Sequence, residues 1–306
     1  MAASNRAAIY TKTHKVLKKH YTPVLPPTDR TVLEHIVYAL CLENSHYEPA
    51  DTVYARLKEE FFDWNELRVS TVAELTAIGK GLPNPSGAMG NVKQFLHSIF
   101  ESRFSFDLEE CRKQNIGKTV KELEGFKGIT PFAIGYVVQA GLNGHAIAVD
   151  AGLLGVMQVL GAISEAEAAK GNIPGMERAI PKTKGAEFAS LVHQLAADYH
   201  ASPHSPRIRP ILLEIDPESK TRLPKRKRQK AEEKEEPAKK PAKKAAPKKA
   251  SAKKESAAKK KPAKKKAAPK KATKKSVPAK KKTAATKKKT TTKASASRKL
   301  TKRKPR

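Results

Sequence analysis

Cysteine is nearly absent from this chain, and long apolar runs are missing altogether. The only cysteines among the 306 residues are Cys41 and Cys111, so we expect a reducing compartment and no disulfide framework. No stretch of about 18 apolar residues and no charged-then-apolar leader occurs, so we expect neither a spanning helix nor a secretory signal. Histidines do not cluster with either cysteine, and we therefore expect no metal site and no cofactor.

Acidic residues are scarce in the last quarter of the chain. Residues 221–306 contain 38 Lys and Arg but five Asp and Glu, whereas residues 1–220 contain 24 basic and 25 acidic residues. The chain is therefore a near-neutral body followed by a polycation. Such a charge density condenses on nucleic acids or on acidic membrane surfaces. Because no amphipathic helix or lipidation motif accompanies the lysines, we expect double-stranded DNA, and not a membrane, as the partner.

The segment 216–306 consists mainly of Lys, Ala, Pro, Ser and Thr. It has too little apolar surface to offset backbone entropy, so the composition predicts a disordered, DNA-binding tail. It resembles the lysine-rich tails of histone H1 and of bacterial H1-like proteins; the alternative is a solubilising extension. The run 223–230 would serve as a nuclear import signal in a eukaryote. In a bacterium the same residues only begin the polycation, and we then expect a cytoplasmic, nucleoid-associated protein.

The segment 30–215 has apolar residues at helical spacing almost throughout, and hairpin-like strand patterns are nearly absent. This pattern predicts an all-α domain of about eight to ten helices joined by short turns. Asp29 or Thr31 is expected to cap the first of these helices, and the segment 70–79 has a cap, an acidic residue and a final glycine. Residues 1–29 are predicted to form a basic arm, either on DNA or free in solvent.

Three segments have the order and spacing of a known motif. They are LEGFKGIT at 123–130, AIAVD at 146–150 and IGKGLPNPSGAMGNVKQFL at 78–96. On these residues the body resembles the HhH-GPD family of base-excision DNA glycosylases, with a layout like that of endonuclease III. The resemblance implies a two-lobed helical body that contains a helix-hairpin-helix.

The resemblance assigns DNA binding to Gly125, Lys127, Gly128 and Thr130. In a helix-hairpin-helix the turn presents consecutive main-chain N–H groups to a phosphate, and glycines allow the backbone to approach closely. Lys127 stands where the family has its second glycine, so it either distorts the turn or adds a cation beside the phosphate. The alternative is an ordinary corner between two helices, without a ligand.

The resemblance assigns catalysis to Asp150, whose family counterpart activates water or stabilises the positive charge that develops on the sugar. The target base would be flipped into a pocket beside this residue. Candidates for the pocket lining are Tyr38, Asn44, Tyr47 and Tyr136. Asp150 also precedes an apolar helical segment, so it could equally be a helix N-cap.

The sequence departs from the family at several functional positions. Bifunctional members need a lysine where this chain has Ile129, so Schiff-base lyase chemistry through that residue is excluded; Lys127 could substitute only from a different direction. No cysteine follows the last helix, so a [4Fe-4S] cluster is not expected. The family has polar residues directly after the aspartate, whereas this chain has the apolar run AGLLG at 151–155. The family also has a glutamine that probes the DNA, and Glu43 or Asn44 stands in its place.

Two hypotheses follow from the sequence. The first is a monofunctional DNA N-glycosylase without lyase activity, anchored on DNA by its polycationic tail. The second is a non-catalytic chromatin or nucleoid DNA-binding protein built on a degenerate glycosylase fold. We expect a monomer in both cases, and the sequence leaves open whether the chain is an enzyme.

Overall fold

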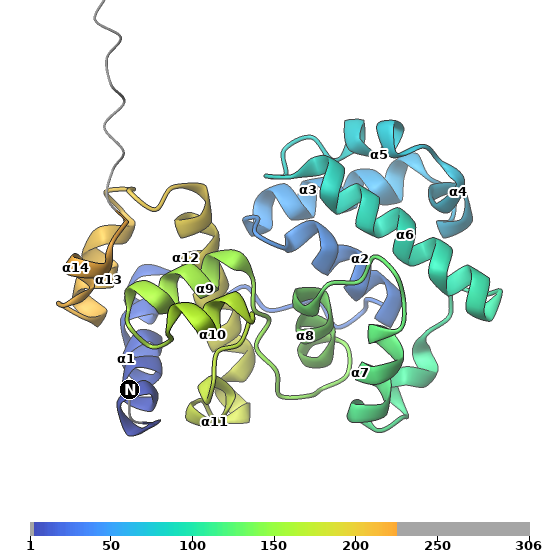
Figure 1. Ribbon diagram of the computed structural model, residues 1–306. Coiled ribbons are helices and arrows are strands. Elements are labelled where there is room, and N and C mark those ends of the chain that lie inside the picture. Colours follow the sequence, from blue (N-terminus) through green and yellow to red (C-terminus); the bar gives the residue numbers. More distant parts are fainter. Residues whose placement is uncertain (1–2, 225–306) are drawn as a thin grey trace, which may run out of the picture. The chain divides into compact units, whose positions relative to one another are not determined.

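The computed structural model describes residues 3–224, and residues 1–2 and 225–306 lie outside this part. The described residues contain 14 α-helices and two 3₁₀ helices, and they form no strand apart from an isolated bridge between Lys80 and Leu82 (Figure 1). The predicted all-α class is confirmed. The helices exceed the predicted number of about eight to ten because several connections contain a single helical turn.

The first lobe is built from consecutive segments around one apolar core (Figure 1). Its centre includes Leu57, Met89, Phe95 and Leu96, all fully buried. The elements of this lobe are α2 (Val32–Leu42), α3 (Tyr47–Glu60), α4 (Trp64–Val69), α5 (Val72–Ile78), α6 (Pro85–Arg103), η1 (Glu109–Arg112), α7 (Ile116–Glu124) and α8 (Pro131–Ala140).

The second lobe joins the beginning of the chain to the later part of the body around a separate apolar core (Figure 1). The two lobes belong to one compact unit. The elements of the second lobe are α1 (Ala3–His20), α9 (Ala151–Val159), α10 (Glu165–Ala169), α11 (Met176–Ala179), η2 (Lys182–Lys184), α12 (Gly185–Ala201), α13 (Ile208–Ile215) and α14 (Ser219–Arg222).

Side-chain caps fix the starts of several helices. Thr31, one of the two residues predicted to cap α2, forms a capping box with Glu34. Thr71 and Glu74 form a second capping box at the start of α5, which ends at Gly79 as the sequence predicts. These local signals were readable because each cap satisfies free N–H groups within four residues of itself.

Residues 1–29 do not form the predicted free arm, since most of this segment belongs to α1. Tyr10 and Leu17 on this helix are fully buried in the core of the second lobe, and Lys18 pairs with Glu187 of α12 at 2.7 Å. The apolar positions of α1 lie between exposed lysines, and this made the segment resemble a solvated arm.

The body also extends beyond the predicted boundary at residue 215. α14 follows α13, and its Arg222 donates from Nε to the carbonyl oxygen of Val159 at 2.9 Å and pairs with Asp216. Residues 216–224 therefore belong to the second lobe. The rest of the predicted disordered tail, residues 225–306, lies outside the described residues.

Candidate nucleic-acid interface

A six-residue turn joins α7 to α8 at the surface of the first lobe, and we call this unit the α7–α8 hairpin. Gly125 is the C-cap of α7, and Thr130 is the N-cap of α8, where its hydroxyl accepts from the N–H of Ala133 at 3.1 Å. Gly125 and Lys127 are exposed, so the turn faces solvent. Lys127 makes no ion pair with any described residue.

Gly128 fixes this turn against α6. It has a positive φ of 83°, which favours glycine, and a Cβ there would lie 2.5 Å from the carbonyl oxygen of Asn91 and 2.7 Å from the amide nitrogen of Phe95. Backbone atoms of a helix cannot move aside as a flexible side chain can. The need for glycine at this position therefore comes from close packing within the protein, in addition to any phosphate.

The main-chain N–H groups of the turn divide into occupied and free ones. Those of Gly125 and Phe126 bond back to carbonyls of α7, and that of Lys127 donates to Oγ of Ser98 on α6 at 3.1 Å. The N–H groups of Gly128 and Ile129 make no hydrogen bond within the described residues. Two consecutive main-chain donors just before the N-cap of α8 are thus unpaired, as in sites that accept an anion.

Asp150 is the N-cap of α9 and is nearly inaccessible, with 1% of its side chain exposed. Its Oδ1 accepts from the N–H of Leu153 at 2.7 Å. Asn44, which has a positive φ, accepts from the neighbouring N–H of Ala151 at 3.1 Å. The start of α9 is therefore capped from both lobes, and the predicted alternative that Asp150 is an N-cap is confirmed.

His193 of α12 lies behind Asp150 in the boundary between the lobes. Its Nδ1 is 3.5 Å from Oδ2 of Asp150, and its Nε2 is 2.9 Å from the carbonyl oxygen of Ser45. Both side chains are buried, and Oδ2 of Asp150 has no hydrogen-bond partner among the residues that the structure describes. Sequence analysis missed His193 because it is 43 positions away from Asp150 and has no recognisable motif around it.

A groove of about 300 Å³ opens beside the hairpin turn. Its polar lining includes Glu43 and Asn44 from the end of α2 and Thr130 from the start of α8. A volume of this size falls at the lower end of the range for ligand pockets. The other lining residues are Leu40, Cys41, Leu82, Pro83, Asn84, Gly87, Ala88, Asn91 and His200.

Glu43 lies in this groove close to Asp150. Burial raises the pKa of the Glu43 carboxyl, and the Asp150 carboxylate raises it further, whereas a hydrogen bond with the Thr130 hydroxyl lowers it. Like charges at short range favour the protonated form of one partner. Glu43 is thus a carboxyl group that lines the groove and has a raised pKa. Sequence analysis noted the residue only as a loss of the family glutamine.

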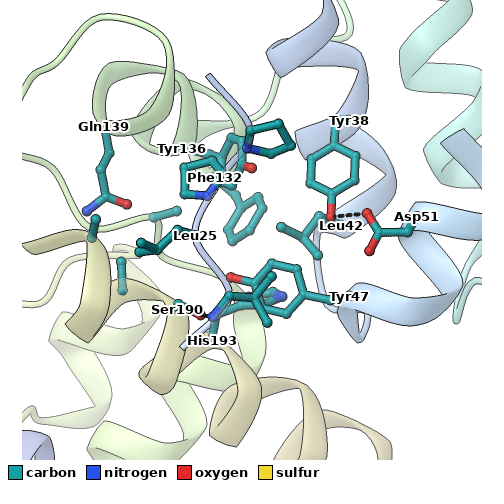
Figure 2. A pocket seen from close by; sticks show the side chains of 16 residues that line it. Leu25, Tyr38, Leu42, Tyr47, Asp51, Phe132, Tyr136, Gln139, Ser190 and His193 are labelled. Carbon is teal, nitrogen blue, oxygen red and sulfur yellow. Dashed lines mark hydrogen bonds between the residues drawn. The ribbon is translucent and has the colours of Figure 1, made fainter. Parts of the chain in front are cut away.

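The three predicted pocket tyrosines line a different, smaller cavity of about 110 Å³ (Figure 2). Tyr38, Tyr47 and Tyr136 come from α2, α3 and α8, and the Tyr38 hydroxyl donates to Asp51 at 2.7 Å. Burial raises the pKa of Tyr47 to about 12. The extended segment 24–27 also lines this cavity. The cavity contains neither Asn44 nor Asp150, so the predicted pocket set is divided between two sites.

Ile129 is half-buried and packs against the core of the first lobe. Lys127 does not line the groove. Within residues 3–224, no cluster of three or more His, Cys, Asp or Glu side chains could hold a metal ion, and no helix is long and apolar enough to span a membrane. The groove is thus lined by a carboxyl group and side-chain amides. Neither Lys127 nor position 129 supplies an amine to it.

Solved structures of endonuclease III with DNA and of a thymine-DNA glycosylase have a backbone similar to that of this chain. A non-covalent endonuclease III–DNA complex aligns with 73% of this chain and 99% of its own, at 16% identity and a TM-score of 0.54. A trapped endonuclease III–DNA covalent intermediate with an estranged adenine aligns with 73% and 100%, at 16% identity and a TM-score of 0.49. A thermostable thymine-DNA glycosylase aligns with 67% and 91%, at 13% identity and a TM-score of 0.45.

The described body has the endonuclease III fold. The predicted resemblance to HhH-GPD glycosylases is thereby confirmed for the fold. No protein-family model and no curated protein sequence matches the chain. At 16% identity the likeness to the endonuclease III fold concerns the backbone, and function has to be argued from the residues of this chain.

Proposed function

We propose that this chain binds duplex DNA and removes a base hydrolytically, as a monofunctional N-glycosylase without lyase activity. The groove beside the hairpin is the main support, since it combines an accessible carboxyl group, Glu43, with the cap of the helix that follows the turn, Thr130. The shared fold with a protein solved in complex with DNA adds to this support.

The hairpin provides the contact with the DNA backbone. The free N–H groups of Gly128 and Ile129 suit a phosphate oxygen, because donors at a helix start lie at the positive end of the helix dipole. Lys127 adds an exposed, unpaired cation beside them. The lysine-rich segment after residue 224 supplies sequence-independent affinity.

The proposed chemistry has no covalent amine intermediate. Ile129 stands at the lyase position, so the sugar C1′ must be attacked by water, and the product is an abasic site in an unbroken strand. Asp150 stays behind the groove and acts through its charge, because its side chain is almost wholly buried. Opposite charge close to the reacting sugar stabilises an oxocarbenium-like transition state.

A non-catalytic DNA-binding protein is the second candidate. It is favoured by the burial of Asp150 and by the groove lining, in which no Phe, Tyr or Trp of the described residues is available to stack on a flipped base. In this case the hairpin would recognise DNA structure alone.

An assay on damaged duplexes separates the two candidates. The full chain is incubated with a panel of duplexes that each hold one damaged base, and products are analysed with and without alkali. The proposal expects abasic sites that break only in alkali, and it expects their loss in Asp150→Asn, since Asn preserves the cap but not the charge. Tight binding with no base loss on any duplex would favour the second candidate.

A further inference from the structure

Glu43 alone carries a carboxyl group among the described residues that line the groove. The other titratable lining groups are His200 and the buried thiol of Cys41. The groups that face Glu43 from neighbouring elements are Thr130 and Asp150. A carboxylate in this position repels phosphate, whereas a carboxylic acid can donate a hydrogen bond or a proton to a neutral ring.

The Asp150 side chain lies next to His193 in the interior of the protein. The carbonyl oxygen of Ser45 can only accept, so Nε2 of His193 carries a hydrogen. Nδ1 then faces Oδ2 of Asp150 at 3.5 Å, and this oxygen has no hydrogen-bond partner within residues 3–224. Asp150 is therefore enclosed by other groups of the protein on this side.

Asp150 is therefore committed to contacts inside the protein. Its Oδ1 accepts from Leu153, its Oδ2 lies 3.5 Å from Nδ1 of His193, and Asp150 is not among the residues that line the groove. Glu43 remains as the acid with access to the groove.

We infer that Glu43 is the catalytic proton donor of the groove, and that the groove takes an uncharged nucleobase. This inference rests on the proposed base-removal function, and it assigns the acid to a residue other than the aspartate of the family motif. The negative charge behind it belongs to Asp150.

The step balances as a hydrolysis. The Glu43 O–H donates its proton to a ring nitrogen or carbonyl oxygen of the base, and the C1′–N bond breaks with its electron pair leaving on the base. The oxygen of a water molecule bonds to C1′, and a proton of that water returns to the Glu43 carboxylate. No oxidant, reductant or other reactant is needed.

The acid determines which bases leave quickly. An uncharged base is a poor leaving group until it is protonated, so it needs Glu43. An N-alkylated purine already has a formal positive charge and leaves without added acid. The dependence on Glu43 therefore differs between the two classes of substrate.

The test compares Glu43→Gln with the full wild-type chain. Single-turnover rates of base loss are measured from about pH 5 to pH 9 on duplexes with uracil, hypoxanthine or 8-oxoguanine, and on one with 7-methylguanine. Glu101→Gln, an exposed residue of α6 with 63% of its side chain accessible, is the matched control. Binding of an undamaged duplex and the melting temperature are recorded for all three proteins.

For an uncharged base, we expect the wild-type rate to fall as pH rises through the pKa of Glu43. Glu43→Gln should lower this rate by about 10²–10⁴-fold and remove the pH dependence, without weakening duplex binding, because the amide carries no charge that would repel phosphate. If both proteins release 7-methylguanine, their rates on it should agree within about threefold, because general-acid catalysis adds little there.

The possible failures are distinguishable. Wild-type rates retained by Glu43→Gln on an uncharged base would overturn the inference and leave the proposed function intact. Release of 7-methylguanine alone by the wild-type chain would also overturn it. Absence of base loss on every duplex, with binding retained, would overturn the proposed chemistry and this inference together.

Discussion

The near-neutral body and the polycationic segment after it differ in how far their positive charge is balanced by negative charge. In the body, acidic residues balance the basic ones in number, and several cations form internal ion pairs; examples are Lys18 with Glu187, Lys19 with Glu214 and Lys58 with Glu34. In residues 221–306 there are 38 basic residues and five acidic ones, so most of the positive charge has no partner in its own segment. The comparison separates attraction to DNA, which needs only charge density, from selection of a site, which needs fixed geometry.

The largest expected effect is the loss of the cationic segment. A chain that ends at Pro224 retains the Arg222 contacts of the second lobe. We expect its affinity for undamaged duplex to fall at least about 10³-fold at about 50 mM salt, and its salt dependence to flatten, because fewer counterions are released on binding. Fluorescence anisotropy over a salt series measures both quantities.

A full-length chain whose lysines after residue 224 are replaced by glutamine is the control for length. It should bind as weakly as the truncated chain. If either protein keeps the wild-type salt slope, the body and not the segment provides the attraction.

The second effect concerns the geometry of the body. Gly128→Ala should lower the free energy of unfolding by about 2–4 kcal/mol, because it adds a clash with the α6 backbone to the cost of a left-handed alanine. Gly175→Ala is the matched control, since Gly175 has a φ of 78° and no atom lies within 4 Å of the place that a Cβ would occupy there. Its loss should be about 1–2 kcal/mol in the same urea titration. Equal losses would mean that the turn does not depend on α6.

The fold could be predicted where the signals are local. The caps at Thr31 and Thr71 involve residues within three positions of each other, and the motif at 123–130 forms one turn between two helices. The core positions Phe95 and Leu96 of α6 were visible as part of one apolar stripe. Each of these features depends on sequence neighbours alone.

The second lobe could not be predicted in the same way, because its partners are far apart in the chain. Tyr10 of α1 is buried in the same core as Phe188 of α12, a pairing that helical periodicity does not reveal. For the same reason His193 was not connected with Asp150, and Tyr38 was expected beside Asp150 although it lines a separate cavity. Glu43 was seen only as a departure from the family, since its access to the groove depends on how α2 and α8 pack.

The third effect is the contribution of one body cation. Lys127→Ala in the chain ending at Pro224 should weaken duplex binding about fivefold and reduce the salt slope by about one, as expected for one phosphate contact. Lys170→Ala, at an exposed position in the second lobe, should change neither quantity appreciably. Identical behaviour of the two variants would place the DNA away from the hairpin.

The smallest effect is a pH-dependent gain in stability. The folded-state pKa of Glu43 is raised above its ordinary value of 4.5, chiefly by burial. The folded chain therefore binds more protons than the unfolded chain between the two pKa values, and its stability falls as pH rises through that window. Glu43→Gln should raise the melting temperature at neutral pH, and this gain should disappear below the ordinary pKa. If the gain in melting temperature is the same at every pH, it comes from better packing of the glutamine and not from titration of Glu43.

The most direct test of the division between attraction and selection uses the body alone. Affinities of the chain ending at Pro224 are measured at one salt concentration for a fully paired duplex and for the same duplex with one abasic-site analogue. We expect weak binding overall with a clear preference, about tenfold or more, for the duplex with the abasic-site analogue, because the hairpin and groove provide fixed contacts. Equal affinity for the two duplexes would contradict the claim that the body selects its site on DNA.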